Sequence, residues 1–200
     1  MYNIRYGLNY LRHRFVANNR HGIHSPFVYK LIDTVIYDYS PQKVYREIEN
    51  MLKQPHPDKH VINSMPLKVY RLLYRFAVYF KPGIVAFAGD ENGILSVPIK
   101  KAVPNASFLN LSTLTGNVSP DLVIIDASAY NIAQNLEKTL MHVHDDTMLV
   151  LTNIHRTKKI KQDWNTLKTD ERVRVTVDLY YLGLVFFKPG MSKEDFRVRY

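Results

Sequence analysis

Residues 83–96, Gly-Ile-Val-Ala-Phe-Ala-Gly-Asp-Glu-Asn-Gly-Ile-Leu-Ser, carry the strongest indication of fold in this chain. The run Ile84–Ala88 is short and apolar throughout, which predicts a strand buried on both faces of a parallel sheet. A polar turn follows between Gly89 and Gly93, and a helix pattern resumes after it. A strand, a glycine turn and a helix are typical of the first unit of a nucleotide-binding sheet. An ordinary turn fits the same two glycines, so both interpretations stay open.

Pro98 limits where this helix can begin. A proline is tolerated in the first turn of a helix, but in the interior it removes a backbone hydrogen bond. We therefore expect the helix to begin near Ser96, with that serine as the N-cap, and to end near Val103.

The rest of the chain continues to alternate strand and helix patterns. Further strands are expected at Ala106–Leu111, Asp121–Asp126, Met148–Thr152, Val173–Tyr180 and Leu184–Phe187, and further helices at Ile132–Val143 and Lys158–Leu167. The connection between the last two strands is too short for a crossover, so they must pair antiparallel. The pattern predicts an α/β fold with a Rossmann-like, doubly wound, mostly parallel sheet. We expect Ile84–Ala88 and Asp121–Asp126 to be adjacent central strands and the hairpin to lie at one edge.

The first 82 residues show helix patterns alone. Helices are expected at Ile4–Val16, Phe27–Ile36, Gln42–Leu52 and Leu67–Phe80. We predict that residues 1–82 form an N-terminal helical segment packed on the sheet, that residues 83–200 form the α/β part, and that the two make one structural unit.

Composition excludes several classes of function. The chain has no cysteine, so disulfides, thiol catalysis and thiolate metal sites are ruled out. No apolar run is long enough to span a bilayer, and the first residues lack the pattern of a signal peptide. We expect a cytoplasmic protein with no membrane partner.

The formal net charge of +9 is concentrated in the front of the chain. Residues 1–81 contain 13 Lys and Arg against 5 Asp and Glu, whereas the remainder contains 14 against 13. A basic, tyrosine-rich front could contact phosphate-rich partners such as nucleic acid. The charges are dispersed along predicted helices, however, which favours solvated helix faces over a nucleic-acid interface.

The order of elements resembles the class I S-adenosylmethionine-dependent methyltransferase fold, whose sheet also ends in an antiparallel hairpin. Four stretches are similar to a group of Bacteroidetes proteins described as methyltransferase-like: Arg-His-Gly-Ile-His-Ser-Pro-Phe-Val at 20–28, the strand at 121–126, the segment 173–188, and Lys-Glu-Asp-Phe at 193–196. The resemblance covers nearly the whole chain. It implies that Gly89, Gly93 and Asp126 belong to a cofactor site for S-adenosylmethionine.

The chain departs from the family where the cofactor would bind. The family typically has an acid near the end of the first strand, and Phe87 stands there in this chain. It also has an acid after the second strand that binds the ribose hydroxyls, and the matching residue here is Ser112 or Asn110. The family then inserts a helix and a strand, whereas Thr113–Pro120 is too short to hold both. These departures predict a degenerate cofactor pocket, with Gly89 and Gly93 as the part that remains.

Metal binding is not predicted. Related metal-dependent O-methyltransferases have Asp-Asn at the end of the fourth strand, and this chain has Thr152-Asn153. Asp126 with Asn153 and His155 would be a poor site for magnesium, which prefers carboxylates, waters and substrate oxygens. The simpler interpretation is that Asp126 caps a loop and that His155 is a solvated surface residue.

The turn with Arg20, His21 and His24 has no assigned role. Two histidines without a carboxylate are weak evidence for a metal site. These side chains could anchor the turn by hydrogen bonds or face the cleft above the sheet, and the sequence does not separate the two. No catalytic residue is identified, since none of the familiar nucleophile, phosphate-loop or zinc-protease motifs occurs.

Three functional hypotheses follow. The first is a methyltransferase-fold protein that has lost S-adenosylmethionine binding and serves as an interaction or structural module with an unknown protein partner. The second is an active methyltransferase with an atypical pocket, and the third is a basic nucleic-acid-binding protein. The missing acids favour the first, for which no cofactor is expected. A fold alone cannot decide among them.

Overall fold

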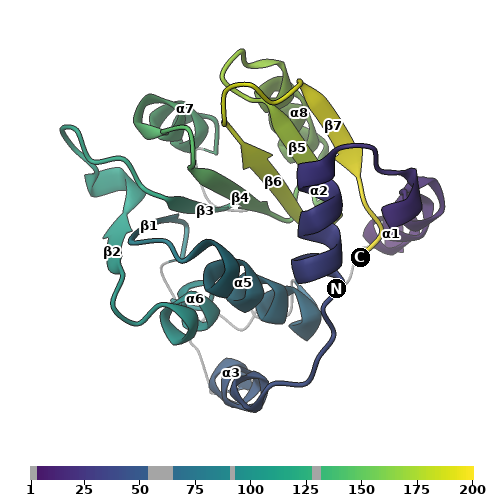
Figure 1. Cartoon of the computed structure of the whole chain (residues 1–200), viewed down its shortest axis with the longest axis horizontal. Coiled ribbons are helices and arrows are strands. Elements are labelled where there is room, and N and C mark those ends of the chain that lie inside the picture. Colours follow the sequence, from purple (N-terminus) through teal and green to yellow (C-terminus); the bar gives the residue numbers. More distant parts are fainter. Residues whose placement is uncertain (1–3, 54–64, 91–92, 128–131) are drawn as a thin grey trace.

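The computed structural model describes residues 4–53, 65–90, 93–127 and 132–200, and it forms an α/β structure around one seven-stranded sheet (Figure 1). The strand order is β2-β1-β3-β4-β6-β5-β7. The strands are β1 Ile84–Ala88, β2 Ser107–Asn110, β3 Leu122–Asp126, β4 Met148–Thr152, β5 Val175–Asp178, β6 Leu182–Phe186 and β7 Glu194–Arg197. The predicted α/β class, with β1 and β3 as adjacent central strands, is therefore confirmed.

The helices lie on both faces of the sheet (Figure 1). They are α1 Ile4–Val16, α2 Pro26–Leu31, α3 Lys43–Lys53, α5 Leu67–Phe80, α6 Ser96–Ala102, α7 Ile132–His142 and α8 Lys158–Thr169. Short turns of other helix types occur at Arg20–Gly22, Ile32–Ile36 and Leu111–Thr113. None of the described helices has the length and apolar character needed to cross a membrane.

Two apolar clusters cover the two faces of the sheet. The larger combines side chains of α2, α3, α5 and α6 with one face of the strands, and the smaller combines α7 and α8 with the other. Central strands such as β3 and β4 are buried at every position, which explains their continuous apolar sequence. Trp164 of α8 is 1% exposed and packs against Gly183 of β6.

The antiparallel hairpin is confirmed, but its position at the edge of the sheet was wrong. β6 pairs antiparallel with both β4 and β5, and β7 adds outside β5 in a parallel register. The sequence of β7 contains three charged residues, so its apolar pattern did not predict a strand. Charged side chains are typical of an edge strand, where they discourage pairing with a further chain.

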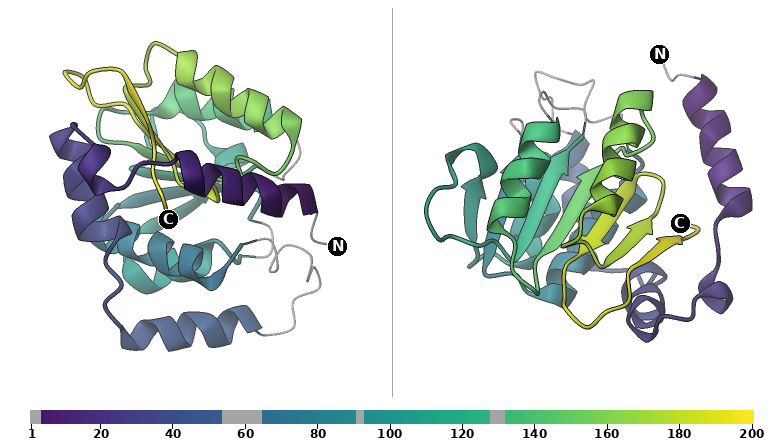
Figure 2. Two further views of the ribbon diagram at one scale, coloured as in Figure 1. Left: turned by 90° about the vertical axis from the view of Figure 1, so that its right-hand side faces the viewer. Right: turned by 90° about the horizontal axis from the view of Figure 1, so that it is seen from above.

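Helix α1 lies beside the β5 and β7 side of the sheet (Figure 2). Ring centroids of Tyr6 and Tyr10 lie 5.0 and 5.1 Å from that of Tyr180, which follows β5. The segment after α1 continues this contact, because Asn18 forms an isolated parallel bridge with Val198. The first and last elements of the chain therefore pack together.

Candidate functional site

The glycine turn after β1 has the backbone conformation that requires glycine. Gly89 and Gly93 have φ angles of 78° and 67°, in the left-handed region that other residues rarely adopt. Residues 91–92, between them, lie outside the described residues. The prediction that Gly89 and Gly93 bind a cofactor stays a prediction, and the conformation explains both glycines without a ligand.

An internal carboxylate occupies the N-terminus of α6. The side chain of Asp90 accepts hydrogen bonds from the backbone N–H groups of Leu95 and Ser96, both at 2.8 Å. The Ser96 hydroxyl donates to the Gly93 carbonyl at 2.8 Å. Ser96 is the first helical residue rather than the N-cap that we expected, so Asp90 performs the capping. Burial raises the pKa of Asp90, although the hydrogen bonds from these N–H groups oppose the rise.

The polar residues at the end of β2 are also bound within the chain. Asn110 Oδ1 accepts from the backbone N–H and the hydroxyl of Ser112 at 2.9 and 2.8 Å. The Lys138 ammonium donates to the Ser112 carbonyl at 2.7 Å. Between β2 and β3 the chain forms one short turn, as the length of this segment predicted. Both polar residues at the end of β2 are therefore uncharged and engaged in contacts within the chain.

Phe87 and Asp126 are both buried at the carboxyl ends of their strands. Phe87 is 8% exposed, and its ring stacks against that of Phe108 with centroids 6.3 Å apart. Asp126 is 5% exposed and accepts a hydrogen bond from the Thr152 hydroxyl at 3.1 Å. Residues 128–131, which follow β3, lie outside the described residues. Neither the loop-capping role nor the cofactor role of Asp126 is tested by this contact.

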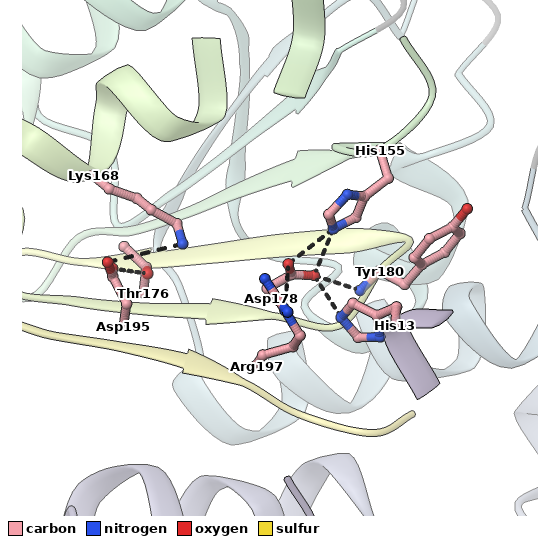
Figure 3. Close-up of polar contacts among 8 residues, drawn as sticks. All are labelled: His13, His155, Lys168, Thr176, Asp178, Tyr180, Asp195 and Arg197. Atoms are coloured by element: carbon pink, nitrogen blue, oxygen red, sulfur yellow. Dashed lines mark hydrogen bonds and ion pairs between the residues drawn. The ribbon is translucent and has the colours of Figure 1, made fainter. Parts of the chain in front are cut away.

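A second group of polar residues lies at the carboxyl end of β5 (Figure 3). Asp178 is 3% exposed, and its carboxylate accepts from Nε2 of His13 at 2.9 Å and from Nε2 of His155 at 2.8 Å. The backbone N–H of Tyr180 donates to the same carboxylate at 2.9 Å. The Arg197 Nε atom of β7 lies 3.8 Å away. Four elements of the chain therefore converge on one buried carboxylate, which we call the Asp178 cluster (His13, His155, Asp178, Tyr180 and Arg197).

The charge of Asp178 is stabilised by its hydrogen bonds. Burial by itself raises the pKa of this carboxyl, but the hydrogen bonds from His13 and His155 outweigh burial and hold the pKa well below its usual range. The Tyr180 ring stacks on His155 with centroids 5.0 Å apart and an interplanar angle of 11°. Burial also raises the pKa of the Tyr180 hydroxyl well above its usual value. At neutral pH this cluster holds an ionised carboxylate beside a neutral phenol.

Backbone strain accompanies the cluster. Tyr180 has a φ angle of 71° and Asn153, two residues before His155, has one of 54°. Such angles are uncommon for residues with a side chain and persist only where surrounding contacts hold them. The Asn153 N–H donates to the Tyr181 carbonyl at 2.6 Å, and the Tyr180 hydroxyl donates to the Tyr6 carbonyl. The first contact joins the end of β4 to the turn after β5, and the second joins that turn to α1.

The same cluster includes the residues of the described chain that could hold a metal ion. One ligand atom from each of His13, His155 and Asp178 lies within 4.8 Å of the others. Two histidines and a carboxylate suit transition metals such as iron or zinc. The donor set fits poorly, because the Nε2 atoms of both histidines lie within hydrogen-bond distance of the carboxylate and the Arg197 Nε atom lies 3.8 Å from it, so the carboxylate already has its partners within the chain. We therefore interpret the cluster as a clamp that joins α1 to the sheet.

Sequence reasoning missed most of this cluster. His155 was considered together with Asp126 and Asn153 and interpreted as solvated, but it bonds Asp178 instead. The position of His13 could have indicated the cluster. This residue lies seven positions after Tyr6 and therefore on the same face of the helix. A histidine on that face needs a polar partner in the layer beneath it.

The turn with His21 and His24 is not part of the Asp178 cluster. Both imidazoles are exposed, and His21 receives its local support through its backbone N–H, which donates to Asn19 Oδ1 at 3.1 Å. His24 lines a separate cavity of about 470 Å³ together with Val175 and Glu194. The side chain of Arg20 lies outside the described residues.

No protein-family model matches this sequence, and no curated protein matches it either. Solved structures do match its fold. A Podospora anserina methyltransferase bound to S-adenosylhomocysteine (SAH) aligns with a TM-score of 0.58 at 11% identity, covering 83% of this chain and 97% of the other. A Geobacter sulfurreducens methyltransferase gives 0.56 at 16% identity, with 82% and 98% coverage. A Bacillus cereus O-methyltransferase in complex with SAH gives 0.53 at 10% identity, with 78% and 94% coverage. The chain therefore has the Rossmann-like fold of class I methyltransferases.

Proposed function

We propose that this chain is a methyltransferase-fold protein that binds S-adenosylmethionine poorly or not at all and serves as an interaction or structural module. The observation that carries the proposal is the Asp90 carboxylate on the backbone N–H groups of Leu95 and Ser96. The N-terminus of a helix after a glycine turn attracts anions. In this chain the anion at that position is the carboxylate of Asp90, a residue of the turn itself.

A bound S-adenosylmethionine would bring its own carboxylate towards this turn. Two like charges about 4 Å apart repel by roughly 1–4 kcal/mol at effective dielectric constants between those of water and a protein surface. Asp90 cannot move away without leaving the N–H groups of α6 unpaired. The Asp90 carboxylate therefore disfavours binding of the amino-acid end of S-adenosylmethionine at this turn.

The residues at the end of β2, where the resemblance places the ribose, also support the proposal. Asn110 and Ser112 hydrogen bond to each other, and neither carries the charge of a carboxylate. Losing a hydrogen bond to a charged group costs about 1.5–3 kcal/mol, which corresponds to a roughly tenfold to hundredfold loss of affinity. The proposal therefore does not depend on the turn alone.

The interaction role is supported by helix α1. Its side chains Leu8, Leu11, Phe15 and Val16 are 51–84% exposed, with Phe15 at the upper limit. The opposite side of the helix is held to the sheet by Tyr6, Tyr10 and His13. A row of exposed apolar side chains on a firmly attached helix is typical of a contact surface for another protein.

The alternative of an active methyltransferase is favoured by the fold and by the retained glycines. Gly89 and Gly93 keep the left-handed conformation, and two of the structural neighbours are described as bound to SAH. In that case S-adenosylmethionine would be the cofactor. Nucleic-acid binding by the basic front and a cytoplasmic location both stay predictions.

Calorimetric titration with S-adenosylmethionine and with SAH tests the proposal. We expect no saturable binding at micromolar concentrations. The Asp90→Asn variant, which keeps a hydrogen-bond acceptor but removes the charge, is expected to bind more tightly than the wild type, because the repulsion between the two carboxylates is gone. A micromolar Kd of the wild type for either compound would overturn the proposal and support the enzyme.

A further inference from the structure

A cavity of about 410 Å³ opens between helices α3 and α5, away from the glycine turn. Cationic and phenolic side chains dominate its lining: Arg46, Lys68, Arg71, Arg75, Tyr45 and Tyr200. We call it the arginine pocket. Its volume is within the range of small-molecule sites, which measure about 300–1,000 Å³.

The arginine pocket has a large excess of positive charge. Glu49 is the carboxylate in its lining, and it already pairs with Lys53 at 2.8 Å and with Arg71 at 3.7 Å. Among the described residues, no carboxylate lies within ion-pair distance of Arg46, Lys68 or Arg75. Solvated helix faces tolerate unpaired cations, but several cations around one cavity indicate a site for an anion.

Arg75 makes this argument stronger because it is buried. It is 6% exposed, and its guanidinium donates to the carbonyls of Val35 and Ile36 at 2.7 and 3.2 Å. It also lies 3.4 Å from the hydroxyls of Tyr45 and Tyr200. These acceptors satisfy its hydrogen bonds but carry no formal charge. The carboxylate of Asp38 interacts with Arg75 only from beyond ion-pair distance. Buried charges in proteins are normally paired, so an anion in the cavity would supply a closer partner.

Arg71 has one guanidinium nitrogen without a hydrogen-bond partner among the described residues. Its Nε atom is buried and makes no hydrogen bond among the described residues. The guanidinium carbon lies 5.3 Å from the centre of the Tyr45 ring, which holds the side chain along the wall of the cavity. The Nε atom is shielded from solvent, but 37% of the side chain is exposed, so the outer guanidinium N–H groups can reach a phosphate, which arginine binds through two parallel N–H groups.

The Tyr200 phenol of the arginine pocket remains a neutral donor and acceptor. Burial raises the pKa of Tyr200 to about 12, although Arg75 opposes the rise. The Tyr200 hydroxyl donates to the Lys68 carbonyl at 2.7 Å. The Tyr39 ring at this cavity stacks on Tyr37 with centroids 6.3 Å apart, but it is 69% exposed, so its other face is open to a ligand. Exposed aromatic rings beside cations are a common platform for the bases of nucleotides.

We propose that the arginine pocket binds a small phosphorylated ligand with an aromatic ring, of the class of nucleoside monophosphates. The phosphate lies among Arg46, Lys68 and Arg71, and the ring packs on Tyr39. A phosphate dianion fits the charge excess better than a single carboxylate does. This site is separate from the glycine turn and does not depend on whether that turn binds S-adenosylmethionine.

Titration of the full chain with AMP, adenosine and inorganic phosphate tests the proposal. At low salt we expect saturable AMP binding, weaker binding of phosphate that competes with AMP, and no detectable binding of adenosine. Affinity for AMP should fall at least fivefold between 50 and 200 mM salt, because the contacts are ionic. Adenosine binding as tightly as AMP, or no AMP binding at millimolar concentration, would overturn the proposal.

Variants locate the site. Arg71→Gln and Lys68→Gln should each weaken AMP binding about tenfold or more, whereas Lys159→Gln, at an exposed position on α8, should leave it unchanged. Arg75→Gln is avoided because it would also remove buried hydrogen bonds of the fold. An AMP affinity that is equal in wild type and Arg71→Gln contradicts the site. Unchanged AMP binding in the presence of excess SAH distinguishes the arginine pocket from the glycine turn, whether or not SAH itself binds.

Discussion

The His13 Nε2 atom lies 2.9 Å from Oδ1 of Asp178, although 165 positions of sequence separate the two residues. Both side chains are about 95% buried. This contact joins α1 to the end of β5, and His155 adds a second imidazole to the same carboxylate. One acidic side chain therefore supplies the charged contact between the first helix and the sheet, beside the aromatic contacts of Tyr6 and Tyr10 with Tyr180.

Replacing that acid should destabilise the protein. Asp178→Asn removes the charge but keeps the size, and it leaves the N–H groups of His13 and His155 competing for one neutral oxygen. We expect the free energy of unfolding to fall by about 2–4 kcal/mol, because charge-assisted buried hydrogen bonds are lost. Urea denaturation followed by circular dichroism measures this. Asp146→Asn, at an exposed ion pair with Lys188, is the control and should unfold like the wild type.

The same carboxylate should make stability depend on acid pH. Its pKa is held below the usual value of about 3.9, so the unfolded chain takes up the proton first as pH falls. The contribution of Asp178 is therefore fully present above about pH 4 and is lost progressively below it. The stability difference between wild type and Asp178→Asn should shrink between pH 4 and pH 2. A difference that grows on acidification would contradict this assignment.

Gly183 should not tolerate a methyl group. A Cβ atom there would lie 2.7 Å from Trp164 Cζ3 and 3.0 Å from Ile154 Cγ2, and both neighbours are buried. We expect Gly183→Ala to lower the free energy of unfolding by about 1–3 kcal/mol through overpacking. Gly7→Ala is the matched control: nothing lies within 4 Å of its Cβ, and alanine favours the helix by about 0.5–1 kcal/mol. The two substitutions should therefore shift the denaturation midpoint in opposite directions.

Asp90 should behave as a helix cap. Asp90→Ala leaves the N–H groups of Leu95 and Ser96 without their acceptor, and we expect a loss of about 0.5–2 kcal/mol in unfolding free energy. Asp90→Asn keeps one acceptor and should lose less. Equal stability of wild type and Asp90→Ala would show that this carboxylate does not stabilise α6.

The strands that were predicted correctly are those whose own residues carry the apolar pattern of a buried strand. Ile84–Ala88 is apolar throughout, and Met148–Thr152 is apolar except for its last residue, because both faces of these strands are covered. The sequence alone therefore indicates their burial. β7 was missed because Glu194–Arg197 is charged and becomes a strand only by pairing with β5. The helix predicted over Phe27–Ile36 changes to a wider helical turn at Ile32–Ile36, which no propensity indicated.

The site was harder to predict because its contacts are distant in sequence. The two glycines were identifiable from the turn itself, and their positive φ angles agree with it. The capping by Asp90 depends on how the turn folds back, and residue types alone do not show this. The Asp178 cluster joins α1, the segment after β4, β5 and β7, and no motif links such distant positions.

The pairing of α1 with β5 and β7 has a consequence for synthesis of the chain. A ribosome adds about 5–20 residues per second, so α1 waits on the order of ten seconds before Asp178 is made. During that time the side of α1 with Tyr6 and Tyr10 is uncovered, and so is the side with Leu11 and Phe15. Apolar side chains exposed on both sides make the nascent helix a natural binding site for a chaperone. Docking of α1 is then a late folding step, and the sheet must assemble from its interior strands before the first helix finds its place.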